Sequence, residues 1–258
     1  MLQGVTLADA GIDAVAVKPT ECAVERATDL AVGTVAVDYE GREHLPSPDT
    51  LATLSDAAAV RVTTPVRADG FDPLGDRSAV PDLPDSVGRV LVAGHAAYLD
   101  EHERERAVAP RLSEAADACA DPWVGTVGIE RLALTVGGTQ FELLGPKTTA
   151  RVNALRTAGF EGGLAVYAPT VMTDDEDAVL DALGAYAARR GPAREALPAD
   201  AATDATAGGR AREVLSQAVR DYGLVGDVDR VRDRVERLRE AGVDRVVAYP
   251  ARGLEPFV

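Results

Sequence analysis

Lysine is almost absent from this sequence, and its two lysines stand where an apolar strand gives way to a helix. Among 258 residues with 27 lysines and arginines, only Lys18 and Lys147 are lysines. Lys18 follows the apolar run 14–17, and Lys147 follows the run 141–145. In a barrel of alternating strands and helices, active sites form at this junction. We therefore expect the two lysines to mark a functional site.

Lys18 is predicted to reach into the mouth of the barrel and is a candidate catalytic residue. Its ammonium could bind an anion, or it could form a Schiff base with a carbonyl compound if burial lowers its pKa. An ion pair with Glu21 or Asp38 would be a purely structural role. The sequence leaves these roles open.

Residues 145–149 read Gly-Pro-Lys-Thr-Thr and have the features of an anion-binding loop. Gly145 lets a phosphate approach the backbone, while the helix start and the hydroxyls of Thr148 and Thr149 supply hydrogen-bond donors. Lys147 adds a positive charge. We assign Gly145, Lys147, Thr148 and Thr149 as candidate cofactor-binding residues. The alternative is an ordinary helix start with a threonine cap and a solvated lysine.

His95 follows the expected fourth strand and is a candidate general acid or hydrogen-bond donor to substrate. A hydrogen-bonded capping residue is the structural alternative. His44 lies in a charged loop and His102 on a charged helix, so both are expected at the surface. No two histidines have metal-ligand spacing, and Cys22 and Cys119 are far apart in the sequence, so no metal site is predicted.

Groups at other strand ends complete the expected site. Asp38 ends the second strand, where it could pair with Lys18 or bind substrate. Arg67 follows the third strand, and Tyr249 and Arg252 end the last strand, as further candidates for substrate binding. Together the two lysines and these arginines would form a basic rim on a strongly acidic protein. Such a rim would focus a small anionic ligand toward the mouth of the barrel.

The sequence alternates strands with helices, which would bring these groups to one end of a parallel sheet. Its apolar runs are rich in Val and Ala and do not alternate with polar residues, as is typical of strands covered on both faces. Strands are expected at 14–17, 34–37, 59–66, 89–93, 126–136, 139–144, 164–168 and 245–249, with 126–136 and 139–144 as a hairpin. Helices are expected at 20–30, 48–57, 99–119, 148–158, 174–190, 210–222 and 228–241.

This alternation predicts an α/β fold, a (β/α)8 TIM-type barrel of seven or eight parallel strands, with allowance for one missing or irregular strand. The barrel is expected to be a single domain over residues 1–258. Residues 192–209, mostly Ala, Asp, Thr and Pro, are predicted to form a mobile low-complexity excursion. Residues 10–19 and 241–250 have similar sequences, each with Ala-Gly, then Ile or Val, Asp, an apolar strand and Pro. This similarity supports ring closure, because the first and last strands are neighbours in a barrel.

Acidic residues dominate the charge, with 42 Asp and Glu and a net charge of −15. Dense surface carboxylates keep a protein soluble in molar salt, so we expect a cytoplasmic protein of a salt-accumulating halophile. An ordinary acidic protein from a GC-rich genome is the alternative. The surface would repel the phosphates of nucleic acids. The N-terminus lacks a signal-peptide pattern, and no apolar run is long enough to span a membrane.

Two segments resemble the bacterial luciferase-like family, which includes flavin-dependent monooxygenases and coenzyme F420-dependent reductases. Residues 144–147 read Leu-Gly-Pro-Lys before a helix, and 158–164 read Ala-Gly-Phe-Glu-Gly-Gly-Leu before a strand. Residues 222–250 carry a Gly-Leu-Val-Gly-Asp turn, a helix, Ala-Gly-Val-Asp and a final strand, as at that family's C-terminus. The resemblance implies an oxidoreductase that transfers a hydride with F420 or FMN, with the cofactor phosphate near Lys147.

The chain also departs from that family. It is shorter than usual members, it has Phe160-Glu161-Gly162-Gly163 in place of Ala-Asp-Gly, and residues 164–172 merge two family strands. These changes leave open a catalytically degenerate barrel that binds a small anionic metabolite or a partner. A Schiff-base lyase that uses Lys18 or Lys147 is a further alternative. The expected partner is a small anionic molecule rather than nucleic acid or a membrane, and a homodimer is left open.

Overall fold

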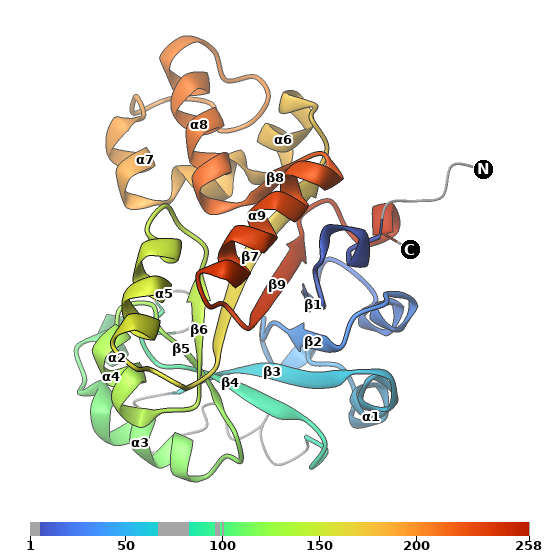
Figure 1. Cartoon of the computed structure of the whole chain (residues 1–258), viewed down its shortest axis with the longest axis vertical. Coiled ribbons are helices and arrows are strands. Elements are labelled where there is room, and N and C mark those ends of the chain that lie inside the picture. The colour runs from blue at the N-terminus through green and yellow to red at the C-terminus, as the bar shows by residue number, and fades with distance from the viewer. Residues whose placement is uncertain (1–5, 67–82, 96–98, 100, 258) are drawn as a thin grey trace.

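The computed structural model describes residues 6–66, 83–95, 99 and 101–257, which form a closed parallel barrel (Figure 1). Eight strands of this described part make the ring, and β9 pairs with both β7 and β1 to close it. In ring order they are β1 (Ala14–Val17), β2 (Thr34–Val37), β3 (Ala59–Pro65), β4 (Gly88–Val92), β5 (Trp123–Gly125), β6 (Thr139–Leu143), β7 (Leu164–Met172) and β9 (Arg245–Pro250). The predicted (β/α)8 barrel is confirmed.

The irregular strand that the sequence allowed for is β7, which spans nine residues. Its first part pairs with β6 and its middle with β9. Its last three residues pair with a short extra strand, β8 (Leu224–Gly226). β7 therefore belongs to the ring and also pairs with β8, the short strand that follows α8.

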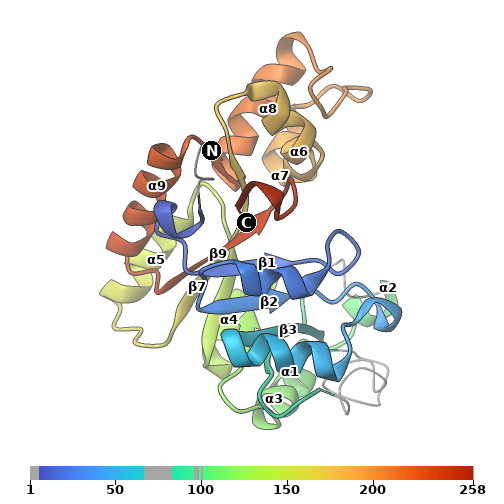
Figure 2. The same cartoon turned by 90° about the vertical axis from the view of Figure 1, so that its right-hand side faces the viewer.

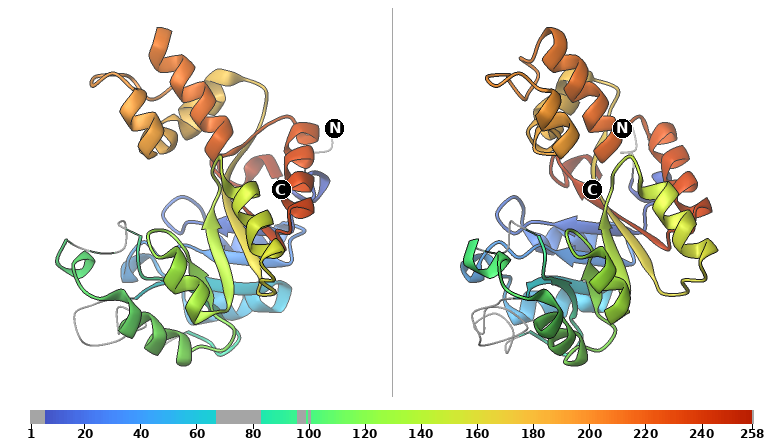
Figure 3. Two further views of the ribbon diagram at one scale, coloured as in Figure 1. Left: turned by 60° about the vertical axis from the view of Figure 1, so that its left-hand side comes forward. Right: turned by 90° about the vertical axis from the view of Figure 1, so that its left-hand side faces the viewer.

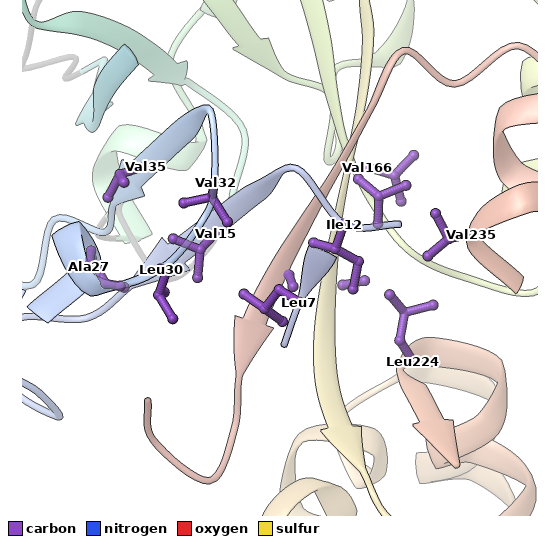
Figure 4. Packing of buried hydrophobic residues seen from close by; sticks show 14 of the residues in the cluster. Leu7, Ile12, Val15, Ala27, Leu30, Val32, Val35, Val166, Leu224 and Val235 are labelled. Atoms are coloured by element: carbon purple, nitrogen blue, oxygen red, sulfur yellow. The ribbon is translucent and has the colours of Figure 1, made fainter. Parts of the chain in front are cut away.

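Alternate residues of the strands enter two different clusters, which explains the unalternating apolar runs. Val15 and Val35 pack outward with Leu7, Ile12 and other residues of the outer layer (Figure 4). The other face of the same strands belongs to a second cluster, in which the alanines of β1 and β2 face bulkier side chains from β5, β6 and β7. All residues of β1 and β2 are buried, so both faces of these strands are removed from water.

Helices cover the outside of the ring, and Figure 2 shows α1 beside β3. The α-helices are α1 (Pro48–Ala57), α2 (Glu101–Arg104), α3 (Val108–Asp117), α4 (Glu130–Val136), α5 (Thr148–Thr157), α6 (Glu176–Ala188), α7 (Gly191–Ala196), α8 (Gly209–Tyr222) and α9 (Val228–Glu240). Short 3-10 helices span Ala8–Ala10, Val24–Asp29, Arg42–His44 and Glu255–Phe257. Side-chain caps at Ser47, Asp175 and Asp227 start α1, α6 and α9, because each oxygen accepts a hydrogen bond from a free N–H of the first turn.

Helices α6, α7 and α8 gather beyond the carboxyl ends of the strands (Figures 1 and 3). They share an apolar cluster of their own, which includes Leu180, Leu183 and Leu215. Residues 192–209 carry most of α7, and Ala193 and Ala207 are buried in this cluster. The mobility of this segment stays a prediction.

Three of the expected elements were wrong in detail. Residues 126–136 and 139–144 do not form a hairpin, since 130–136 is helix α4 and β5 runs parallel to β6. The helix expected at 20–30 is a 3-10 helix over Val24–Asp29. The helix expected at 99–119 is two helices, α2 and α3.

The first and last strands of the barrel are neighbours, as the similarity between residues 10–19 and 241–250 predicted. β1 pairs with β9 through Ala14 and Val15. Gly11 and Gly242 each have a positive φ, 72° and 109°, so each ends a helix in the left-handed region that favours glycine. Within the described residues, no helix is long and apolar enough to cross a bilayer, and no cluster of three or more metal-ligating side chains occurs.

Candidate active site

A pocket of about 240 Å³ lies at the carboxyl ends of the barrel strands, and every strand of the ring contributes to its wall. It brings together four residues that the sequence singled out: Lys18, Asp38, His95 and Tyr249. Apolar wall comes from the side chains of Val92, Phe141 and Leu143, among others. This mouth pocket combines apolar surface with convergent titratable groups, which is the usual composition of a ligand site.

Lys18 and Tyr249 form a hydrogen-bonded network with Glu21 at one side of the mouth pocket. The Lys18 ammonium donates to Glu21 Oε1 at 3.0 Å and to the Tyr249 hydroxyl at 3.1 Å. The Tyr249 hydroxyl donates in turn to Glu21 Oε2. Burial alone would lower the pKa of Lys18, but these hydrogen bonds together raise it. Burial and Glu21 raise the pKa of Tyr249 to about 12.

Asp38 is a buried carboxylate in the mouth pocket, with 7 % of its surface exposed. Among the described residues, the Tyr167 hydroxyl makes its one side-chain hydrogen bond, at 3.4 Å to Oδ2. Burial raises the pKa of Asp38 to about 7, and the nearby Lys18 charge only partly opposes that shift. A carboxyl group that is half ionised near neutral pH suits general acid or base work.

Two arginines and a tyrosine at the end of α6 also line the mouth pocket: Tyr186, Arg189 and Arg190. The Arg190 guanidinium lies 4.0 Å from the centre of the Tyr186 ring. Burial and the Arg190 charge lower the pKa of His95, so the imidazole is mainly neutral at pH 7. None of these three residues was singled out from the sequence as a candidate.

The predicted phosphate loop lies elsewhere. Gly145 and Thr149 line a separate groove of about 520 Å³ between α5, the end of α8, and α9. The Thr148 hydroxyl accepts a hydrogen bond from the Gly145 N–H at 3.0 Å and donates to Glu142 at 3.1 Å, so the loop uses these groups internally. Lys147 is exposed. The groove contains Arg220, Arg234 and Arg237, but the mouth pocket has no lining residue in common with it.

The remaining predicted residues are not brought to the mouth pocket by the described structure. Arg252 is exposed after β9 and does not line it. Arg67 lies outside the described residues. The predicted basic rim is therefore only partly formed by described residues, through Lys18. The arginines that line the mouth pocket are Arg189 and Arg190, and Lys147 and Arg252 do not line it.

The geometry of Lys18 predicts that it does not form Schiff bases. An amine nucleophile needs a lowered pKa, whereas the ammonium of Lys18 is stabilised by two hydrogen bonds. With borohydride and a panel of aldehydes and ketones, peptide mapping should find no more adduct on Lys18 than on the exposed Lys147. A carbonyl compound that labels Lys18 selectively would contradict this prediction.

Comparison with solved structures gives two matches over nearly the whole chain. An F420-dependent secondary alcohol dehydrogenase, solved with an F420-acetone adduct, superposes with a TM-score of 0.57 at 14 % identity, over 93 % of this chain and 94 % of that chain. The monooxygenase RslO1 from Streptomyces bottropensis gives a TM-score of 0.49 at 15 % identity, over 95 % of this chain and 94 % of that chain. The first likeness shows the fold.

No curated protein matches the sequence. One protein family does match, described as a family of unknown function (DUF7388), and its match runs over residues 7–257. That range takes in every strand of the barrel and every residue of the mouth pocket. This chain belongs to the DUF7388 family.

Proposed function

We propose that this protein is a luciferase-like oxidoreductase that transfers a hydride with F420 or a flavin at the mouth of its barrel. The observation that carries the proposal is the mouth pocket itself, which joins a buried carboxyl group, hydrogen-bond donors and apolar wall at the carboxyl ends of the strands. The shared fold with an F420-dependent alcohol dehydrogenase supports it by analogy.

The residues of the mouth pocket fit the ring of such a cofactor. One edge of a flavin-type ring carries carbonyl oxygens, for which the third N–H of Lys18 offers a donor, since Glu21 and Tyr249 take the other two. The hydrocarbon part suits the wall made by Val92, Phe141 and Leu143. The volume of about 240 Å³ lies below the ~300–1,000 Å³ of most ligand pockets. A ring fills this space, so the tail of the cofactor belongs outside it.

When bound, the cofactor supplies the hydride transfer, and the chain supplies orientation and proton handling. Asp38 holds or accepts a proton at its carboxyl group near neutral pH, because burial raises its pKa to about 7. His95 lines the same pocket with a mainly neutral imidazole, because burial and the Arg190 charge lower its pKa. The apolar wall excludes water from the reacting groups.

The loop 145–149 stays the proposed phosphate site. Thr149 and Arg237 line the same groove, and an arginine is a good partner for a phosphate. The internal hydrogen bonds of Thr148 reduce the number of donors that the loop can offer. Binding there would therefore depend on arginine side chains more than on the loop.

The test is a titration of the purified protein with F420 and with FMN in molar salt, followed by fluorescence. We expect at least one of them to bind with saturation, and Asp38→Asn to keep that binding. Absence of binding by both cofactors would reject the oxidoreductase.

A second candidate is a non-catalytic barrel that binds a small anionic metabolite. The small volume of the mouth pocket favours it, because the described residues leave room for one small molecule only. In that case small carboxylates would raise the melting temperature of the protein, while F420 and FMN would not.

A further inference from the structure

We propose that Arg190 and Tyr186 form a subsite for an ionised oxygen on the bound ring. The mouth pocket would then prefer the anionic ring of F420 to the neutral oxidised ring of a flavin. This inference rests on the proposed function, since it concerns which of the two cofactors the chain selects. Its basis is an arginine without a carboxylate partner and a buried hydroxyl without an ordinary hydrogen bond, both judged among the described residues and both on the wall of the mouth pocket.

Arg190 has no carboxylate partner among the residues that the structure describes. Its guanidinium instead packs on aromatic rings, with its central carbon 4.0 Å from the centre of the Tyr186 ring and 5.7 Å from that of Tyr222. Its Nε is buried and has no hydrogen-bond acceptor in the described part of the chain. On a protein with 42 acidic residues, a half-buried arginine without an acid beside it is unusual.

The hydroxyl of Tyr186 is buried too, and the Arg190 side chain lies close to it. Among the described residues, no partner has the distance and angle of an ordinary hydrogen bond to this hydroxyl. A buried hydroxyl or N–H without a partner costs free energy, so such a group in a pocket needs an explanation, and binding of a ligand is one. Burial raises the pKa of Tyr186, and Arg190 opposes that shift only in part, so the phenol keeps its proton at neutral pH. Both groups therefore present hydrogen-bond donors.

Among the described residues that line the mouth pocket, Arg190 is the half-buried cation without a carboxylate partner. Lys18 is engaged with Glu21, and Arg189 is exposed to solvent. Of the described residues that line the pocket, Asp38 is the one carboxylate, and its hydrogen bond comes from Tyr167. His95 lines the same pocket, and the Arg190 charge adds to burial in lowering its pKa.

The two cofactors differ in the chemistry that this subsite would recognise. The ring of F420 carries a phenol-type hydroxyl that ionises near neutral pH, whereas the ring of a flavin carries methyl groups and is neutral when oxidised. An oxyanion would satisfy both orphan donors and neutralise the guanidinium through charge-assisted hydrogen bonds. A methyl group would leave both groups unsatisfied.

The test compares riboflavin with the phosphate-free core of F420, since both carry the same ribityl chain and neither has a phosphate. By fluorescence titration in molar KCl, we expect the F420 core to bind about 10- to 100-fold more tightly. Its visible absorption band should also show that binding raises its ionised fraction at a pH below its own pKa. Arg190→Met should abolish both effects, and Tyr186→Phe should weaken them. The matched control is Arg194→Met, which removes an exposed arginine one turn along and should change neither.

The outcomes separate this inference from the proposed function. Equal binding of the two compounds by the wild type would overturn the inference and leave the oxidoreductase standing. Binding of neither would overturn both. If Arg190→Met does not fold, Arg190→Lys keeps a charge without the planar fork and should retain part of the preference, while Tyr186→Phe still tests the hydroxyl. A Tyr186→Phe protein that ionises the F420 core as fully as the wild type, with unchanged affinity, would overturn the role of Tyr186.

Discussion

Asp38→Asn is expected to stabilise the folded protein at pH 8 and to slow any proton-coupled reaction by about 10²–10⁴-fold. The folded-state pKa of Asp38 is raised to about 7 from an ordinary 3.8, because the carboxylate is buried with one long hydrogen bond. A shift of about three pKa units corresponds to about 4 kcal/mol at most. Asparagine keeps an acceptor for Tyr167 but carries no charge, so the substitution should recover about 1–3 kcal/mol of this cost.

The sign of the pH dependence follows from the direction of the shift. A raised folded-state pKa means that the unfolded chain releases its proton first as pH rises. The contribution of Asp38 is therefore fully present below about pH 4 and is lost as pH rises through about 7. The difference in free energy of unfolding between Asp38→Asn and the wild type should grow in favour of the variant across this range.

Denaturant unfolding from pH 4 to pH 9 at constant salt measures this difference. Asp200→Asn, which removes an exposed carboxylate in the segment after α7, is the matched control and should follow the wild type at every pH. A variant that tracks the wild type within error would show that Asp38 is ionised without cost. A variant that is more stable but reacts more slowly would indicate that Asp38 serves function at a cost in stability.

Much of the barrel could be predicted because its local signals agree with its tertiary packing. The Val and Ala runs of β1 and β2 are buried on both faces, as unalternating strands should be. Ser47 before Pro48 starts α1 with the expected side-chain cap. Gly11 and Gly242 end their helices in the left-handed region, and this common turn sets the first and last strands in register for closure.

The hairpin prediction failed where tertiary packing overrode local preference. Thr, Val and Leu in residues 126–136 suggested a strand, and Gly137-Gly138 suggested a turn. The structure instead buries Ile129 and Ala133, four residues apart, in a cluster with Leu112 of α3, which requires a helix. The glycines end that helix, and Gly138 approaches the Pro122 carbonyl so closely that a Cβ would lie 2.3 Å from it.

The site was predicted in part for a similar reason. Lys18, Asp38 and His95 follow strands of one parallel ring, and Tyr249 lies near the end of β9. Their convergence is therefore a consequence of topology that the sequence reveals. Tyr186 and Arg190 reach the same pocket from α6, about one helix length after β7 ends. Their position depends on how α6 and α8 pack over the mouth, and no local spacing encodes that.

Arg156→Met is expected to cost about 2–4 kcal/mol of stability, because this arginine joins three segments at the amino end of the barrel. All five of its N–H donors are used. Nη1 donates to the carbonyls of Phe160 and Gly162 at 2.8 Å each, and Nε and Nη2 donate to the Gly242 carbonyl at 3.0 and 2.9 Å. Nη2 also donates to Asp244 at 2.7 Å, and the same Asp244 oxygen accepts from the Leu164 N–H.

These hydrogen bonds of Arg156 explain why position 242, three residues before β9, has no side chain. A Cβ on Gly242 would lie 2.6 Å from the Arg156 side chain, so glycine is what lets the guanidinium reach the carbonyl. Arg156→Lys should rescue little, since an ammonium has three donors and no planar fork. The comparison is Arg210→Met, whose pair with Glu213 is 71 % exposed on both sides and should be worth less than about 0.5 kcal/mol. Equal losses of unfolding free energy for the two variants would show that Arg156 acts as an ordinary surface charge and that β7 and β9 close the ring without it.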